Sequence, residues 1–173
     1  MDLKQTLALY NAIPNLLWSI LNLLPISVFC YSYVELKLFY IHLAAGLFTL
    51  FLPRSFFNAI QLSKTVSVYR SLGVHLMNRY TQNGTIINQL IKRRFPDYKV
   101  VSKRSVSQLV GQSYMLEKFH FMMFTLFVII AFHALVRQYY GWALILFFNN
   151  IIYNVYPCLL QQFIRVKLNR AKN

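Results

Sequence analysis

The chain has 173 residues, of which 57% are hydrophobic, 17% aromatic and only 13% charged. A soluble domain of this size needs more polar surface, and the apolar residues are gathered into long runs, so the composition excludes a soluble globular protein. Eighteen lysines and arginines stand against four acids, which gives a net charge of +14. Such an excess is typical of proteins that bind nucleic acid or anionic lipid, and also of positively charged cytoplasmic loops.

Four apolar stretches are long enough to be predicted as transmembrane helices, for which about 20 mostly apolar residues are needed. They cover about residues 7–33, 36–52, 119–136 and 140–163. Prolines inside the first and last stretches predict kinks rather than ends, because neighbouring groups can satisfy the carbonyls that a proline leaves free. The expected fold class is therefore an all-α membrane protein with four transmembrane helices in a single membrane domain, residues 1–173.

The segment between the second and third predicted spans, residues 54–118, is expected to be a cytoplasmic, amphipathic helical segment. From Phe57 to Leu76 its apolar residues recur at roughly helical intervals with basic residues between them, which predicts an amphipathic helix. Asn83-Gly84 is typical of a turn, and a second short helix with a basic end follows until Pro96-Asp97. Basic amphipathic helices beside membrane spans usually lie among lipid head groups.

The distribution of the basic residues predicts the orientation in the membrane. Sixteen of the eighteen lie before the first span, between the second and third, or after the fourth, and the two tight connections hold only Lys37 and Arg137. Positively charged loops stay on the cytoplasmic side, so both termini and the segment 54–118 are expected in the cytoplasm. This topology accounts for most of the net charge, and no nucleic-acid partner is expected.

Glu117 and His120 form the sharpest local feature, at the predicted cytoplasmic entrance of the third span. Their spacing of three residues puts both on one helical face, where the carboxylate can orient the imidazole. One interpretation is a general base, His120, held in one tautomer by Glu117; the other is a surface pair that anchors a helix end. No metal is expected, because a di-iron centre needs more acids than the chain has and no Cys/His cluster has zinc-ligand spacing.

The fourth predicted span carries a polar stripe formed by Asn150, Asn154, Pro157 and Gln161, at intervals of four, three and four residues. Amides in hydrocarbon are costly unless they are hydrogen-bonded, so this stripe must face other helices or a ligand. Two interpretations stay open. The amides either hold helices together or line a site that a polar head group enters from the cytoplasmic side.

These features resemble the glycosyl-diaponeurosporenoate acyltransferases, small bacterial membrane proteins of staphyloxanthin-type carotenoid synthesis. Those proteins show a Glu and a His before a span, a later Asn and Pro, and a motif close to Gln-Arg-Tyr-Asn-Arg-x-Arg. The matching residues here are Glu117, His120, Asn154, Pro157, Gln161, Arg165 and Lys167. The chain departs from the motif at three positions, where Gln162 replaces Arg, Phe163 replaces Tyr and Ile164 replaces Asn.

The resemblance implies an integral membrane acyltransferase of the bacterial cytoplasmic (inner) membrane, which moves a fatty acyl group to a hydroxyl of a lipid or of a glycosylated carotenoid. His120 and Glu117 are then the expected catalytic residues. The residues expected to bind substrate are Asn150, Asn154, Gln161, Arg165 and Lys167. No cofactor is expected. The expected partners are membrane lipids and an acyl donor, which is either acyl-CoA or another acyl compound. The alternative is a non-catalytic membrane subunit or lipid-binding scaffold, and a homo-oligomer stays open.

Overall fold

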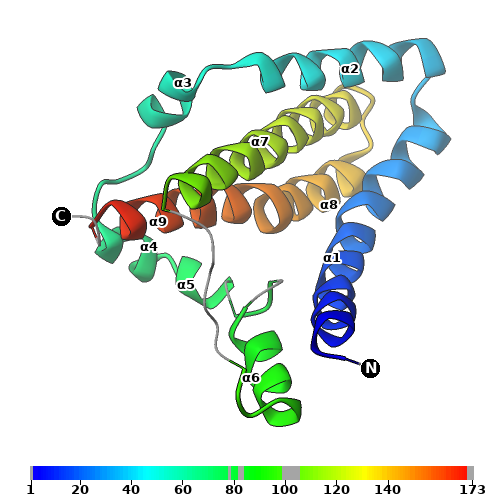
Figure 1. The fold of residues 1–173 in the computed structure, drawn as a ribbon. Coiled ribbons are helices and arrows are strands. Elements are labelled where there is room, and N and C mark those ends of the chain that lie inside the picture. Colours follow the sequence, from blue (N-terminus) through cyan, green and yellow to red (C-terminus); the bar gives the residue numbers. More distant parts are fainter. Residues whose placement is uncertain (1, 78, 82–83, 99–105, 171–173) are drawn as a thin grey trace.

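The computed structural model describes four parts of the chain, residues 2–77, 79–81, 84–98 and 106–170. These parts fold into helices joined by short connections, and no strand occurs among them (Figure 1). The all-α class predicted from the sequence is confirmed.

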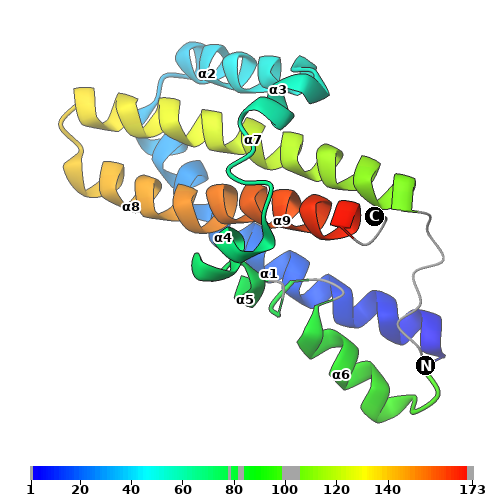
Figure 2. The ribbon, with the colours of Figure 1, turned by 90° about the vertical axis from the view of Figure 1, so that its left-hand side faces the viewer.

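Two long helical runs form the centre of the fold. The first is α7 (Val106–Val136), and the second consists of α8 (Tyr140–Asn150), the π-helical turn η2 (Ile151–Val155) and α9 (Tyr156–Arg170). They are joined by a tight turn at Gln138, so they run antiparallel and pack side by side along their lengths (Figures 1 and 2). This pairing brings the start of α7 next to α9.

The remaining helices surround this pair. α1 (Leu3–Tyr33) packs with its C-terminal half against α7 and α8, and α6 (Thr85–Arg94) lies beside its N-terminal half. α2 (Leu36–Phe48) and the 3-10 turn η1 (Thr49–Phe51) lie along α7, on the side away from α8 and α9 (Figure 2). α2 approaches α7 closely at Gly46, where a Cβ would lie 3.3 Å from the Cβ of the facing leucine on α7.

Three of the four predicted spans are long and apolar enough to cross a membrane: the helical runs Leu3–Tyr33, Val106–Val136 and Tyr140–Arg170. The stretch predicted as the second span is a shorter apolar helix, Leu36–Phe51. At about 1.5 Å per residue it falls short of the about 30 Å hydrocarbon core, so its crossing of the membrane stays a prediction. The helical run Val106–Val136 begins earlier than the third span was predicted to begin, so residues 106–118 belong to this helix and not to a separate segment.

The first part of the segment 54–118 differs from the prediction of an amphipathic helix between Phe57 and Leu76. It forms three short helices: α3 (Arg54–Ala59), α4 (Val66–Ser71) and α5 (Val74–Met77). Gly73 has a φ of 72°, a left-handed conformation that ends a helix and that glycine adopts without strain. Before α4, the backbone N–H groups of Leu62 and Ser63 donate to side chains instead of to backbone carbonyls four residues earlier, as they would in a helix. The second predicted helix is confirmed as α6.

The prolines of α1 do not end the helix, as predicted, because another helix satisfies a backbone group that one of them leaves free. Pro25 has no N–H for the carbonyl of Leu21, four residues earlier. The Asn149 side chain of α8 donates to the carbonyls of Leu21 and Asn22, at 3.3 Å each. Tertiary packing therefore supplies the hydrogen bond that the local sequence removes.

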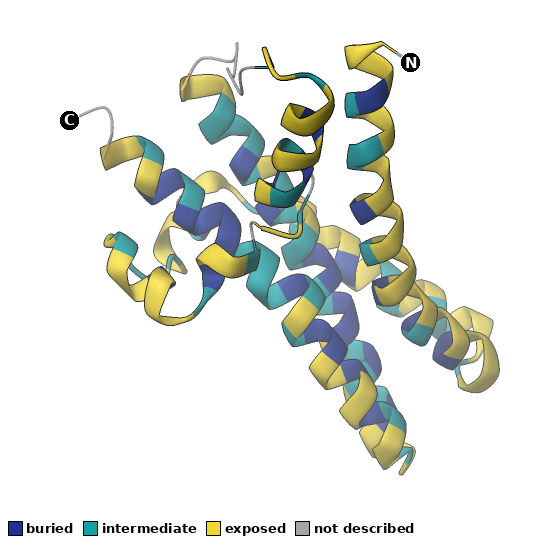
Figure 3. Ribbon diagram, turned by 90° about the horizontal axis from the view of Figure 1, so that it is seen from below, coloured by how far each residue is buried: buried dark blue, intermediate teal, exposed yellow. Residues whose placement is uncertain are grey.

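Most buried apolar side chains of the described residues form two clusters. The larger cluster fills the junction of α1, α7 and α8, and the smaller one joins α4 and α5 to α9. The outward faces of the long helices expose large apolar residues instead, such as Leu16, Phe132 and Phe148 (Figure 3). Such continuous apolar surface is unusual for a soluble monomer and fits contact with lipid.

Candidate functional site

A buried ion pair joins the two central helical runs. Glu117 of α7 is fully buried, Arg165 of α9 is 2% exposed, and the carboxylate Oε2 is paired with the guanidinium Nη1. Nε and Nη2 of Arg165 are buried without a hydrogen-bond partner among the described residues. Uncompensated charges are costly in a low-dielectric interior, so each of these two side chains depends on the other.

The helical spacing on each run produces this pairing. Tyr114 and Glu117 lie three residues apart on α7, and Gln162 and Arg165 lie three residues apart on α9, so each pair shares one helical face. Where the faces meet, Gln162 Nε2 donates to Glu117 Oε1 at 2.8 Å, and the Arg165 guanidinium lies 4.1 Å from the centre of the Tyr114 ring. Both carboxylate oxygens are thus engaged by α9.

A second set of hydrogen bonds connects the polar cluster of Tyr114, Glu117, Gln162 and Arg165 to the segment before α4. Gln162 Oε1 accepts from the backbone N–H of Leu62 at 3.1 Å and from the Tyr69 hydroxyl at 3.2 Å. The same hydroxyl lies 3.0 Å from the Ser63 carbonyl, so this carbonyl and Gln162 Oε1 share its single proton, and it accepts from the Ser63 N–H at 3.1 Å. Burial raises the pKa of Tyr69 above its usual value, and the Ser63 hydrogen bond and the Arg165 charge offset only part of that rise. Tyr69 therefore stays protonated at neutral pH.

His120 lies one turn further along α7, and its neighbours differ from the expected ones. Its imidazole lies against the backbone of Tyr153 and the side chain of Asn154, both in η2. Glu117 does not hold His120 as predicted, because Gln162 and Arg165 bind the two oxygens of the Glu117 carboxylate. The i, i+3 spacing allows a Glu–His contact, but the packing of α9 against α7 provides stronger partners.

The π-helical turn η2 explains why the backbone of Tyr153 can contact His120. Pro157 has no N–H for the carbonyl of Tyr153, four residues earlier, so this carbonyl lacks its ordinary α-helical donor. The helix widens into η2 at this point, and π-helical turns occur frequently at functional sites. The helix does not end at Pro157, as predicted, because α9 continues to Arg170, and the widened turn lies against His120.

The polar stripe predicted on the fourth span divides into parts. Asn150 Nδ2 donates to the Phe124 carbonyl of α7 at 3.1 Å, and its Oδ1 accepts from Asn154 Nδ2 at 3.0 Å. Asn150 thus holds helices together, whereas Asn154 connects it to His120. Gln161 is buried in α9, and Lys167 is exposed beyond the cluster.

Three residues of the cluster were absent from the sequence-based site: Gln162, Tyr69 and Tyr114. Gln162 stands where the resembling motif has an arginine, and its three-residue spacing from Arg165 is the signal that would have placed it on the same face. Tyr69 lies 93 residues from its partner Gln162, and no local pattern reports that contact. Among the described residues no group of three or more His, Cys, Asp or Glu side chains is placed to hold a metal ion.

In the part of the chain that the structure describes, fold and site define a helical protein with three candidate membrane spans and a buried carboxylate–guanidinium centre between its two central helical runs. A family model described as glycosyl-4,4'-diaponeurosporenoate acyltransferase matches residues 53–173, which include that whole centre. The chain belongs to this family, so the resemblance inferred from the sequence is confirmed. No curated protein and no solved structure shows a significant match to the chain.

Proposed function

We propose that the chain is an integral membrane acyltransferase that moves a fatty acyl group to a hydroxyl of a lipid or of a glycosylated carotenoid. The observation that carries this proposal is the buried Glu117–Arg165 pair with His120 one turn away, inside the region that the acyltransferase family model matches. Ionisable groups buried within candidate membrane helices are expensive and usually functional. A general base and a cation close together suit acyl transfer, which removes a proton and develops negative charge.

The reaction can be assigned to the residues of this site. His120 takes the proton of the acceptor hydroxyl as its oxygen bonds to the carbonyl carbon of the acyl donor. The two unpartnered nitrogens of Arg165 stabilise the negative charge that develops on the carbonyl oxygen, while Glu117 holds the guanidinium in place. The bond from carbon to the leaving group then breaks, and the leaving group receives the proton from His120. Asn154 positions the imidazole.

The topology belongs to the same proposal. Residues 36–52 are a fourth span, reached with the help of η1 and of basic residues that extend toward the head groups. Both termini and the helices α3 to α6 face the cytoplasm of a bacterium, because the basic residues concentrate there. This orientation places the Glu117–Arg165 pair at the cytoplasmic end of the two long runs, which an acyl donor from the cytoplasm can reach.

Labelled acyl-CoA and a membrane lipid extract, added to the purified protein in lipid nanodiscs, test this proposal. His120→Ala should reduce acyl transfer by about 100-fold or more, the usual contribution of a general base, without changing thermal stability. The control is His75→Ala, because His75 is exposed on α5 and lies outside the cluster. Unchanged transfer by His120→Ala would remove His120 as the base.

A non-catalytic membrane subunit or lipid-binding scaffold is the second candidate, and one observation favours it. Asn149 and Asn150 donate to backbone carbonyls of α1 and α7, so part of the polar stripe serves helix packing. Comparing the lipids of cells with and without the chain separates the two candidates. An acylated product that disappears with His120→Ala supports the enzyme, whereas an unchanged lipid profile supports the scaffold.

A further inference from the structure

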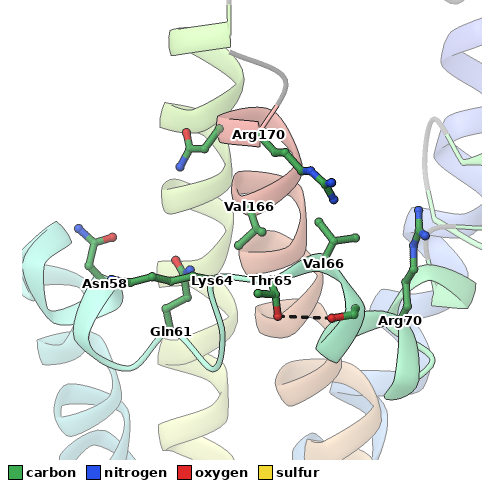
Figure 4. A pocket seen from close by; sticks show the side chains of 10 residues that line it. Asn58, Gln61, Lys64, Thr65, Val66, Arg70, Val166 and Arg170 are labelled. Carbon is green, nitrogen blue, oxygen red and sulfur yellow. Dashed lines mark hydrogen bonds between the residues drawn. The ribbon is translucent and has the colours of Figure 1, made fainter. Parts of the chain in front are cut away.

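A polar groove of about 990 Å³ lies where the C-terminal end of α9 meets the segment between α3 and α5 (Figure 4). Its walls come from α3, the connection before α4, α4 itself and the last turns of α9. Three cations from three different elements line it: Lys64, Arg70 and Arg170. None of the three is among the residues expected to bind substrate.

The composition of the groove suits an anion with several oxygens. Among the residues that the structure describes, the lining includes the three cations, the hydroxyls of Thr65 and Ser67 and several amides, but no carboxylate. Like charges that line one groove repel one another, and a bound anion relieves that repulsion. Phosphate groups accept hydrogen bonds from lysine, arginine and hydroxyl groups, and charged pairs make these bonds strong. The volume matches the range of about 300–1,000 Å³ that is usual for small-molecule sites.

Two chains of contacts lead from the groove to the buried ion pair. On one side Asn58, which lines the groove, accepts a hydrogen bond from the Tyr114 hydroxyl, and the Tyr114 ring lies under Arg165. On the other side α4 forms the groove wall with one face and places Tyr69 on the other, where the Tyr69 hydroxyl bonds to Gln162. The groove and the candidate reaction centre are therefore parts of one connected structure.

We propose that this groove binds the phosphate-bearing part of the acyl donor, a coenzyme A thioester, and that the thioester arm extends from there toward Arg165 and His120. The inference rests on the proposed acyl transfer and adds the chemical class of the donor. The groove is too polar for an acyl chain, whose natural place is the exposed apolar surface of the long helices. Phospholipid head groups carry the same phosphate chemistry, so the test must distinguish the two sources.

The test measures the binding of unacylated coenzyme A by calorimetry, with the full chain in zwitterionic nanodiscs. The variant Lys64→Gln/Arg70→Gln/Arg170→Gln removes the cations of the groove. The matched control, Lys92→Gln/Arg93→Gln/Arg94→Gln, removes the same charge from exposed positions on α6. We expect the groove variant to bind roughly tenfold more weakly, since three exposed charge pairs each contribute modestly, and the α6 variant to bind nearly as wild type does.

Equal weakening by both triple variants would overturn the proposal, because it would show that only overall charge matters. Native mass spectrometry of the solubilised protein addresses lipid: if the groove variant loses bound phosphatidylglycerol but keeps its coenzyme A affinity, the occupant is a head group and the donor assignment is wrong. If acyl transfer proceeds with an unchanged KM for acyl-CoA in the groove variant, the groove inference fails and the acyltransferase stands. Groove-dependent binding without acyl transfer to any acceptor refutes the enzyme alone.

Discussion

Replacing Glu117 by glutamine removes the charge opposite Arg165 while preserving the size of the side chain and an acceptor for Gln162. The guanidinium is 2% exposed and cannot release its proton, so it remains a buried charge without a counter-ion. Breaking a buried pair in this way costs about 3–5 kcal/mol. For a chain of this length that loss lowers Tm by roughly 6–20 °C, at about 2–4 °C per kcal/mol.

The reverse change and the double variant complete the test. Arg165→Met leaves a buried carboxylate, which can take up a proton, so its Tm should fall less than that of Glu117→Gln. Glu117→Gln/Arg165→Met removes both charges, and the loss should be much smaller than the sum of the two single losses. A large departure from additivity is the signature of direct pairing.

The assay is a thermal scan in detergent with a thiol-reactive dye. Cys30 and Cys158 are free, with Cys30 buried and Cys158 half-buried, so both become reactive as the helices separate. Glu35→Gln is the matched control, since Glu35 is exposed and its side chain makes no capping hydrogen bond to α2. The reasoning is refuted if Glu117→Gln shifts Tm no more than this control, or if the double variant loses the full sum.

Three further predictions concern packing and pH. Gly46→Val should destabilise the chain by about 1–3 kcal/mol in denaturant unfolding, because the close approach of α2 to α7 leaves no room, whereas Gly141→Val, with open space around it, should show no such steric loss. Asn149→Leu should lower the free energy of unfolding by about 1–3 kcal/mol, because it removes the donor to the Leu21 carbonyl. The loss should be much smaller in a Pro25→Ala background, where the restored backbone N–H satisfies that carbonyl, and equal losses in both backgrounds would contradict this account. The pKa of Tyr69 is raised in the folded state, so its contribution to stability is complete below about pH 10 and is lost as the pH rises through the folded value. Tyr69→Phe should therefore flatten the alkaline end of the stability–pH curve.

The presence and apolarity of the long helices could be predicted from the sequence, because both depend on local properties. Runs of about 20 apolar residues need no tertiary information, and three of the four predicted runs are long enough to span. The turn at Gly84 and the break at Pro96 bound α6 as predicted. Glu117 was chosen from its spacing to His120 and Arg165 from the resemblance, and the structure places these two residues in contact.

Tertiary packing decided the partners within the site. Spacing along α7 favoured a contact between Glu117 and His120, but Gln162, 45 residues away from Glu117, takes one carboxylate oxygen and Arg165 takes the other. Which turn of α9 faces which turn of α7 depends on the register of two helices, and that register follows from side chains on both surfaces at once. Tertiary contact also contributes to the division of the segment from Phe57 to Leu76, where the backbone N–H of Leu62 donates to the distant side chain of Gln162.

By itself, then, the sequence determined the membrane-type helical class, the concentration of positive charge and the family to which the chain belongs. The helical class and the charge are sums over neighbouring residues, and the family follows from a sequence pattern along one continuous stretch of the chain. Only the tertiary structure decided that Glu117 is held by Arg165 and Gln162, that His120 lies against the π-helical turn, and that three cations line one groove. Such contacts join segments that are far apart in the chain, and they exist only once the helices have packed in one register.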